Sequence, residues 1–307
     1  MNFLQLQKKF PNEKAVITHF LAIRYNGIPV CPHCASVSVY HSNTAPKKFQ
    51  CKDCNNSFSI FKDTIFENSS TDLVKWMYAI HLFLNGKKGI SGLQLMREVG
   101  VTYKTAWRML KQIRLAMGNE DMKDYFETIV EIDETYVGGK PRKGNKGRND
   151  KGEDNTPKRG RGTKKTPVIG VIDRDNKKVH AKVALPNQDG KKLTGKQLMS
   201  VLNEVTKAGA TVMTDEFRSY NILSKHGFIH LKVDHTKEFA SGINHTNNIE
   251  SFWATLKRGV YGIYHSISVK YLQNYVNEFC FRYNNRKDVN MFDLLLVKSI
   301  SKKPTFN

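Results

Sequence analysis

Apolar positions at the start of the chain predict helices on either side of a compact segment. Residues 11–26 end at Asn26-Gly27, a pair typical of helix ends, and they predict one short helix. From Ser70 the apolar residues recur at the spacing of one helix face, with Ser70 or Thr71 available as the N-terminal cap. The residues of this face are Leu73, Trp76, Met77, Ile80 and Leu84.

Two further helices are predicted in tandem. "ISGLQLMREVG" predicts a helix that ends at Gly100, and "VTYKTAWRMLKQIRLAMG" predicts a longer one that Thr102 caps. The tight Val-Gly-Val turn between them has helix-turn-helix spacing. Near the start of the second helix, polar and basic side chains lie outside the apolar face, where they either contact a DNA groove or form a solvated surface. They are Tyr103, Lys104, Thr105, Arg108 and Lys111.

After Asp121 the pattern changes to strands. "ETIVEIDETYVGG", "TPVIGVIDRD" and "KKVHAKVAL" are rich in β-branched residues, and an Asp-Asn turn joins the last two. A helix over about 194–207 and the strand "ATVMTDEF" come next, and further helices follow. Three strands, a helix, a fourth strand and later helices predict a mixed α/β fold.

A segment without aromatic or aliphatic side chains separates the first two of these strands. Residues 139–166 contain eleven Lys and Arg against three Asp and Glu, together with six glycines. Such a segment buries too little apolar surface to order itself, so it predicts a mobile arm. The arm is either a solvated linker or a salt-sensitive contact for DNA phosphates. Its candidate DNA contacts are Arg142, Lys143, Arg159 and Arg161.

The overall charge points to the same class of partner. The 307 residues include 49 Lys and Arg against 28 Asp and Glu, a formal net charge of +21. An excess this large indicates a polyanion, and double-stranded DNA is the simplest one. A membrane fits poorly, because the longest apolar run, "YAIHLFL", is too short to cross a bilayer. The start "MNFLQLQKKF" lacks the order of a signal peptide, so we expect a cytoplasmic protein.

Two Cys-x-x-Cys pairs, separated by sixteen residues, predict a metal site. In a cytoplasmic chain such pairs indicate metal ligands rather than disulfides. Each pair can direct both thiolates at one ion, which gives the tetrahedral sulfur coordination that Zn²⁺ accepts. Four protein ligands leave no open position, so the expected zinc is structural. The ligands are Cys31, Cys34, Cys51 and Cys54.

Acidic residues stand at three positions where apolar packing is otherwise expected. Asp133 lies in the strand motif "VEIDETYVGG", Asp215 ends "ATVMTDEF", and Glu250 begins the helix "NNIESFWATLKRGVYG". An α/β sheet brings such groups together at strand ends, and converging carboxylates are ligands for Mg²⁺ or Mn²⁺. Two such ions support in-line phosphoryl displacement. Lys257 returns to the face of Glu250, where it either grips a phosphate or pairs with a carboxylate.

Neighbouring residues compete for each of these acidic roles. Glu131 lies two residues before the first carboxylate and points the same way on a strand. Glu216 directly follows the second carboxylate, and its side chain is expected to face away. Asn247 competes with the third carboxylate, for which a plain surface role is the other alternative.

Three motifs that follow the cysteine pairs along the chain resemble those of a known family. "EIDETYVGGK", "TDEFRSY" and "HTNNIESFWATLKRGVYGIYH" resemble those of zinc-ribbon DDE transposases of bacterial insertion sequences, of the ISXO type and related to eukaryotic Merlin elements. The resemblance covers nearly the whole chain. It implies an RNase-H-like catalytic domain and a two-metal triad of Asp133, Asp215 and Glu250. Some members of the group carry Asn or His at the third position. Nearby residues of these types are His245, Asn247 and Asn248.

These observations predict an N-terminal helix and zinc ribbon over 1–68, a helix-turn-helix region over 69–120 and an RNase-H-like α/β catalytic domain over 121–307 with the insertion 139–166. The expected function is a DNA transposase that binds terminal inverted repeats and cleaves and joins strands with two Mg²⁺ or Mn²⁺ ions. A homo-oligomer is expected on DNA, at the bacterial nucleoid. The alternatives are an RNase-H-like nuclease or resolvase without strand transfer, and a non-catalytic DNA-binding regulator.

Overall fold

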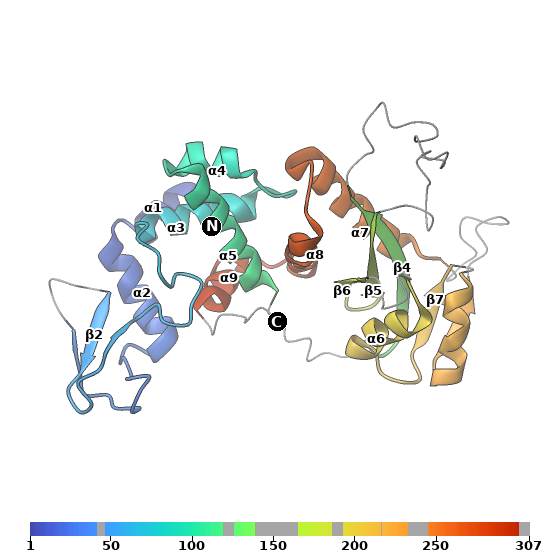
Figure 1. Ribbon diagram of the computed structural model, residues 1–307, viewed down its shortest axis with the longest axis horizontal. Coiled ribbons are helices and arrows are strands. Elements are labelled where there is room, and N and C mark those ends of the chain that lie inside the picture. The colour runs from blue at the N-terminus through green and yellow to red at the C-terminus, as the bar shows by residue number, and fades with distance from the viewer. Residues whose placement is uncertain are drawn as a thin grey trace, which may run out of the picture. The chain divides into compact units, whose positions relative to one another are not determined.

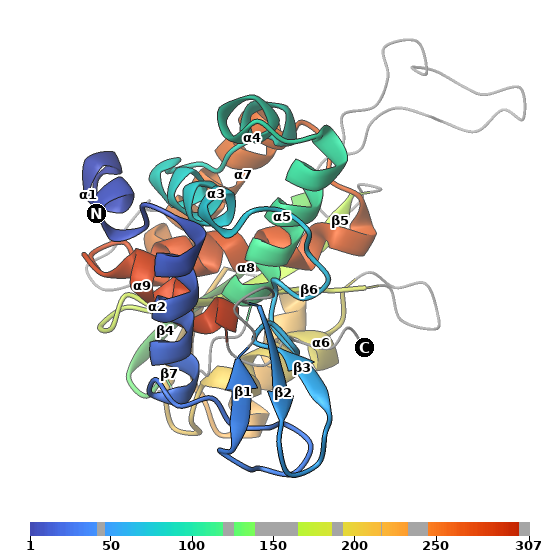
Figure 2. The same cartoon turned by 90° about the vertical axis from the view of Figure 1, so that its left-hand side faces the viewer.

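The chain forms two compact units, shown in Figure 1 and Figure 2. The first unit comprises Met1–Glu120 with Asn285–Asn307, and the second comprises Asp121–Asn284. The computed structural model describes residues 1–41, 47–118, 126–138, 165–185, 193–215, 217–232 and 245–300. No helix within these ranges is long and apolar enough to cross a membrane.

The first unit begins with two helices and a small antiparallel sheet, whose strands lie side by side in Figure 2. Asn2 and Asn12 cap the helices, because their side-chain oxygens accept hydrogen bonds from backbone amides three residues later. Phe49 stacks on His41 and Phe58, so aromatic contacts support a sheet with little core of its own. The elements are α1 (Phe3–Lys9), α2 (Glu13–Tyr25), β1 (Val39–His41), β2 (Lys48–Cys51) and β3 (Ser57–Ser59).

Three helices of the first unit pack against one another. Their caps are Asp72, Ser91 and Thr102, whose side chains accept hydrogen bonds from amides two or three residues on. Thr102 is the predicted cap. The prediction of Ser70 or Thr71 for the first of these helices is wrong, because Asp72 accepts from the amides of its first turn. The helices are α3 (Leu73–Asn85), α4 (Gly92–Val99) and α5 (Tyr103–Met117).

Helix α9 (Met291–Ile300) packs with the first unit, although the sequence placed it at the end of the catalytic domain. It contacts α2, α3 and α5. Phe292 lies 6.2 Å from Phe10 between ring centres, and Leu295 and Leu296 are fully buried. The sequence analysis predicted only that further helices follow the sheet, and it did not identify the surface that covers this one.

A five-stranded mixed sheet forms the centre of the second unit (Figure 1). The strand order is β6-β5-β4-β7-β8; β4 is antiparallel to β5 and parallel to β7, and β7 is parallel to β8. This mixed α/β order is RNase-H-like and confirms the predicted fold class. The strands are β4 (Ile129–Val137), β5 (Thr166–Asp173), β6 (Val179–Val183), β7 (Thr211–Thr214) and β8 (Ile229–Lys232).

Helices cover both faces of this sheet, and β4 divides its side chains between them. Val130 and Ile132 belong to the core beneath α6 and the 3₁₀-helix η2. Glu131 and Asp133 point to the opposite face, where they meet α7. Strand alternation therefore places the predicted catalytic carboxylate beside α7. The helices are α6 (Gly195–Val205), η2 (Arg218–His226), α7 (Asn247–Gly259) and α8 (Val269–Asn284).

Helix α7 approaches the sheet closely at Gly170 of β5. A Cβ atom at this position would lie 2.6 Å from Cη2 and Cζ2 of Trp253 and 3.0 Å from Cδ1 of Ile249. Real Cβ atoms do not approach ring carbons to that distance, so the absence of a side chain allows α7 to pack at this depth.

We predict that Gly170→Ala destabilises the second unit. The added methyl group must displace Trp253 or shift α7, and overpacking of this kind costs about 1–3 kcal/mol of unfolding free energy. Urea denaturation measures this change. The matched control is Gly262→Ala in the π-helix η3 (Val260–Tyr264), where a Cβ would meet nothing within 4 Å. Equal stability changes for the two variants would contradict the role of Gly170.

Candidate functional site

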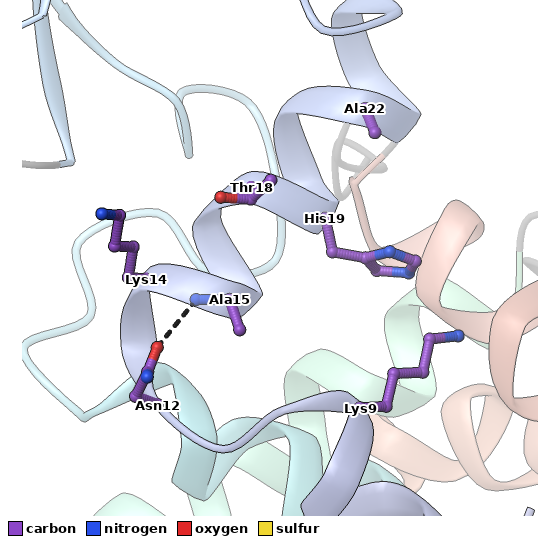
Figure 3. A pocket seen from close by; sticks show the side chains of 7 residues that line it. All are labelled: Lys9, Asn12, Lys14, Ala15, Thr18, His19 and Ala22. Atoms are coloured by element: carbon purple, nitrogen blue, oxygen red, sulfur yellow. Dashed lines mark hydrogen bonds between the residues drawn. The ribbon is translucent and has the colours of Figure 1, made fainter.

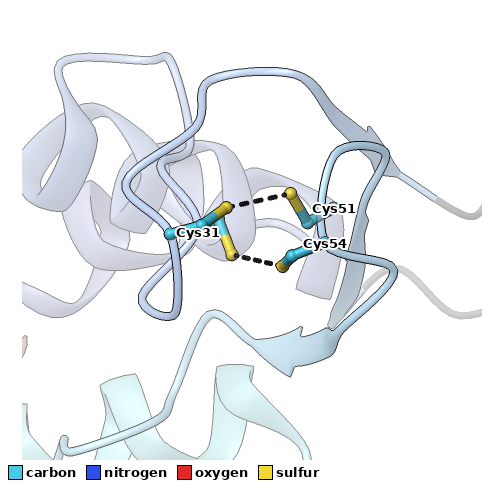
Figure 4. A group of neighbouring side chains, drawn as sticks. Cys31, Cys51 and Cys54 are labelled. Atoms are coloured by element: carbon cyan, nitrogen blue, oxygen red, sulfur yellow. Dashed lines mark hydrogen bonds between the residues drawn. The ribbon is translucent and has the colours of Figure 1, made fainter.

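Four cysteine sulfurs meet beside the small sheet of the first unit (Figure 4). All four lie within 4.8 Å of one another, with 3.7 Å between Cys31 and Cys54 and 3.5 Å between Cys34 and Cys51. Four sulfurs bound to one zinc at about 2.3 Å lie about 3.8 Å apart in a tetrahedron. Asn56 Nδ2 donates to the sulfur of Cys54 at 3.4 Å, an interaction that suits a thiolate. The cluster therefore fits the predicted structural zinc.

Asp133 lies on β4, level with Asp215, which directly follows the neighbouring parallel strand β7. The register pairs Glu131 of β4 with Met213 of β7, so the next residues on the same side are Asp133 and Asp215. Phe217 N donates to Asp215 Oδ1 at 3.0 Å, which turns the chain away from the sheet directly after β7. The carboxylate of Asp133 thus projects from within β4, beside the end of β7, where Asp215 lies.

The environment of Asp133 opposes the charge on its carboxylate. Burial raises the pKa of Asp133 to about 7, and the carboxylates of Glu134 and Asp215 contribute to the rise. Trp253 Nε1 donates to Asp133 Oδ2 at 3.0 Å, which orients the carboxylate and favours its ionised form. A divalent cation between Asp133 and Asp215 would relieve the repulsion, and carboxylate oxygens are the ligands that Mg²⁺ and Mn²⁺ prefer.

Glu250 occupies the first turn of α7, and its side chain is turned toward its own helix. Its side chain is exposed, and Oε1 accepts a hydrogen bond from Thr246 Oγ1 at 2.9 Å. Trp253, which binds Asp133, follows one turn later on the same face, and the half-buried Lys257 follows one turn after that. Among the residues described, only the cysteines form a group with all ligand atoms within 4.8 Å, so the three carboxylates are not closed around one point.

Glu131, the competitor of Asp133, has a different environment. It is fully buried and accepts hydrogen bonds from Arg174 Nε at 2.7 Å and Ile249 N at 3.0 Å. Asn248 donates twice, from Nδ2 at 2.7 Å and from its backbone amide at 3.0 Å. These four bonds fill the roughly four acceptor positions of a carboxylate. Glu131 therefore offers no oxygen lone pair to a metal, unlike Asp133.

Two alternatives for the third ligand belong to the surroundings of Glu131. Asn248 uses its side-chain amide to bind that carboxylate. The backbone carbonyl of His245 accepts a hydrogen bond from Arg174, and its Nδ1 lies 3.5 Å from Glu131 Oε1. Asn247 is exposed at the start of α7. Glu216 lies outside the described residues.

Tyr220 is a buried polar residue near the carboxylates that the sequence analysis missed. Its hydroxyl donates to Glu134 Oε2 at 2.9 Å, on the sheet face opposite α7. Burial raises the pKa of Tyr220 well above its usual value, and the charges of Glu134, Asp133 and Asp215 add to this. The tyrosine therefore stays a hydrogen-bond donor to Glu134. The motif "TDEFRSY" carried the signal, since it places this tyrosine five residues after a predicted ligand.

The outer face of α5 carries aromatic and basic side chains. Tyr103 and Trp107 are 51% and 37% exposed, and Lys104 is exposed beside them. Lys111 Nζ lies 5.7 Å from the centre of the Trp107 ring. The sequence analysis missed Trp107, although it follows Tyr103 at helical spacing.

Two of the predicted DNA contacts on α5 form hydrogen bonds within the first unit. Arg108 is half-buried and donates to the backbone carbonyl of Glu67 at 2.7 Å. The amide of Thr105 donates to Thr102 Oγ1 at 3.2 Å, which is the capping bond of the helix. The remaining predicted contacts lie outside the described residues. They are Arg142, Lys143, Arg159 and Arg161.

A hollow lies beside α2 (Figure 3). Lys9 and His19 point into it, and burial together with the charge of Lys9 lowers the pKa of His19. Its lining contains no carboxylate and no thiol, so it lacks the groups that the predicted chemistry needs. The lining residues are Lys9, Asn12, Lys14, Ala15, Thr18, His19 and Ala22.

Known families match both parts of the chain. The ISXO2-like transposase domain matches residues 126–284, and the transposase zinc-ribbon domain matches residues 11–57. An uncharacterised protein in the transposable element ISH50 of Halobacterium salinarum is 31% identical over 273 residues, 82% of this chain and 87% of that protein. An uncharacterised transposase-like protein of Haemophilus influenzae is 32% identical over 103 residues, 33% of this chain and 83% of that protein.

Similarities to solved structures are weaker. A chain of the simian T-cell lymphotropic virus intasome in complex with PP2A regulatory subunit B56 gamma has a TM-score of 0.32 and 13% identity, with 66% of each chain covered. A chain of a pre-cleavage Mos1 transpososome has a TM-score of 0.29 and 12% identity, with 75% of this chain and 80% of that chain covered. The family therefore rests on the sequence matches, and the fold on the strand order.

We predict that Cys51→Ser removes the zinc and unfolds the ribbon. Oxygen replaces one sulfur of a closed four-sulfur site, and such sites contribute folding energy directly. Metal analysis by mass spectrometry is expected to find one zinc per chain in the wild type and none in the variant. Cys280→Ala is the matched control, since this buried cysteine lies on α8 in the second unit. Zinc retained in Cys51→Ser, or lost in Cys280→Ala, would contradict the assignment of the ligands.

Proposed function

Because the chain belongs to the ISXO2-like transposase family, we propose that it is a DDE-type DNA transposase that binds the terminal inverted repeats of an insertion sequence and cleaves and transfers DNA strands. The observation that carries this proposal is the placement of Asp133 on β4 beside Asp215, which directly follows the parallel strand β7 of an RNase-H-like sheet, with Trp253 of α7 bound to Asp133. The site acts in the bacterial cytoplasm, on DNA of the nucleoid.

The catalytic ligands are Asp133, Asp215 and Glu250, which hold Mg²⁺ or Mn²⁺, with two ions expected. Bound divalent ions supply charge stabilisation at the attacking and leaving oxygens of an in-line phosphoryl displacement. To join the other two carboxylates, the Glu250 side chain would have to leave its bond to Thr246. Lys257 follows on the same helix face and contacts a DNA phosphate there.

Two phosphoryl transfers at this site account for the overall reaction. In the first, water attacks the phosphate at the element end, and the bond to the 3′-oxygen breaks to leave a free 3′-hydroxyl. In the second, this hydroxyl attacks a phosphate of the target DNA and displaces another 3′-oxygen. Neither step requires a covalent bond to the protein. Both element ends must be present together, so the protein acts as a homo-oligomer on DNA.

The exposed face of α5 is the proposed contact for the terminal repeat. A recognition helix directs the residues near its start at base edges in the major groove. On α5 the corresponding exposed residues are Tyr103, Lys104 and Trp107. Lys111, also on this face, and the basic residues of the insertion 139–166 contribute phosphate contacts, which strengthen binding most at low salt. Arg108 contributes indirectly, because its bond to Glu67 holds the helix in place.

We predict that Asp133→Asn, Asp215→Asn and Glu250→Gln each lower strand cleavage about a thousandfold, since loss of one metal ligand removes several kcal/mol of charge stabilisation. Cleavage of labelled terminal-repeat DNA in Mg²⁺ measures the effect, with thermal unfolding as a check of folding. Glu204→Gln, a surface carboxylate of α6, is the control and retains full activity.

Joining of pre-cleaved ends separates a transposase from a nuclease or resolvase. The wild type is expected to join such ends to target DNA, whereas a nuclease without strand transfer would cleave and never join. A non-catalytic regulator would show no metal-dependent cleavage, and the carboxylate variants would then match the wild type in every assay.

We predict that Trp107→Ala and Lys104→Ala weaken DNA binding in different ways. Loss of the aromatic contact to bases is expected to cost about 1–3 kcal/mol on terminal-repeat DNA and little on unrelated DNA. Loss of Lys104 is expected to weaken both similarly and to reduce the salt slope by about one. Fluorescence anisotropy at several salt concentrations measures both quantities. Unchanged affinity in both variants would exclude α5 as the recognition element.

A further inference from the structure

Glu131 connects three elements of the second unit through one buried carboxylate. It lies on β4, its ion-pair partner Arg174 follows the end of β5, and the amides that it binds belong to the first turn of α7. The glutamate is 0% exposed and the arginine is 9% exposed. Charges buried to this degree must be fully paired, because each one left without a partner costs several kcal/mol.

The carboxylate caps α7 from outside the helix. The first amides of a helix have no partner within it, and a side chain just before the helix usually binds them. Thr246 holds that position, yet its side chain forms no cap bond to α7 and donates to Glu250 instead. Glu131 accepts from the amides of Asn248 and Ile249, so a residue of the sheet replaces the usual cap.

Arg174 fixes this cap in position. Its Nε donates to Glu131 at 2.7 Å, and its guanidinium also donates to the backbone carbonyl of His245, directly before the helix. The backbone of Arg174 is itself held, because its amide donates to Ile129 O at 3.0 Å. The preceding Asp173 is fully buried and accepts from the next turn, which sets the direction of the arginine.

Helix α7 is thus attached to β4 at two points, with Glu250 between them. The first point joins Glu131 to Asn248 and Ile249, and the second joins Asp133 to Trp253. Glu250 directly follows the first point and precedes the second by one turn. Its backbone can therefore not move relative to Asp133 unless one of the attachments breaks.

We infer that Glu131, with Arg174, is a positioning residue that sets the distance of Glu250 from Asp133 and so the affinity of the site for divalent cations. The inference rests on the proposed metal-dependent function. Glu131 touches neither metal nor DNA, and it acts only through the start of α7.

The decisive variant is Glu131→Gln, which keeps the shape and removes two acceptor positions. A glutamine amide must direct its NH₂ group either at the amides of α7 or at Arg174 and the Asn248 side chain, all of which are donors. The start of α7 therefore shifts while the core is kept. The expected result is a Mn²⁺ affinity 10–100-fold lower than that of the wild type, as measured by isothermal titration calorimetry of the full-length protein.

Glu278→Gln is the matched control. Glu278 is also a fully buried glutamate of the second unit, bound by Arg282 at 3.0 Å and by Tyr264 at 2.9 Å, but it lies on α8. This variant is expected to lose thermal stability and to keep wild-type Mn²⁺ affinity. An equal loss of Mn²⁺ affinity in both variants would reduce Glu131 to a general stabilising residue and overturn the inference.

Arg174→Lys supplies a second measurement that does not alter the carboxylate. Lysine keeps the charge but cannot reach Glu131 and the His245 carbonyl together in the arginine geometry, so Mn²⁺ affinity is expected to fall here as well. Titrations are made at a temperature where thermal unfolding shows every variant folded. Wild-type affinity in both Glu131→Gln and Arg174→Lys overturns the inference.

Failure of the proposed function would give a different result in the Mn²⁺ titrations. If the wild type binds Mn²⁺ no better than Asp133→Asn, the carboxylates are not a metal site and the proposed function fails. If the wild type binds Mn²⁺ in an Asp133-dependent manner and both Glu131→Gln and Arg174→Lys match it, only the positioning role fails. The Mg²⁺ concentration for half-maximal strand cleavage gives an independent comparison, and it is expected to rise in Glu131→Gln.

Discussion

The second unit depends on one buried charge, the carboxylate of Glu131. A charged group without water is tolerated only where donors replace its hydration, and here the donors come from the turn after β5 and from the start of α7. The sheet therefore cannot adopt its final state without the helix in register. Packing alone would permit α7 to slide along the sheet, whereas directional bonds to two consecutive amides fix where the helix begins.

Two acidic residues on the same side of β4 have opposite roles because their donors differ. The oxygen acceptor positions of Glu131 are filled by hydrogen bonds, so none is left for a metal ion. Asp133 accepts a hydrogen bond from the indole of Trp253, but burial raises its pKa to about 7, and the charges of Glu134 and Asp215 add to the rise. The hydrogen bonds of Glu131 stabilise the fold, whereas the charges around Asp133 repel one another, and a bound cation would relieve that repulsion. Because side chains alternate along a strand, Glu131 and Asp133 face the same side of the sheet, two residues apart, and each meets a different part of α7.

Local patterns in the sequence were sufficient for features that neighbouring residues determine. The cysteine spacing predicted the sulfur cluster, and the cap at Thr102 predicted the start of α5. Features determined by distant partners were not predictable. Periodicity showed that Arg108 lies near the outer face of α5 but not that the carbonyl of Glu67 binds it, and it could not separate Glu131 from Asp133. Strand β8 and the attachment of α9 to the first unit were missed for the same reason.

Packing and chemistry are coupled in the second unit through Trp253. The indole lies over Gly170, where any side chain would push it away, and its Nε1 orients the Asp133 carboxylate. The residue that seats α7 in the core is thus also a contact of the proposed metal ligand. Since Glu250 lies on the same helix, one rigid body carries the third carboxylate and orients the first. Under the proposed function, Asp133 and Asp215 supply the charge, and the position of α7 sets whether Glu250 can share a cation with them.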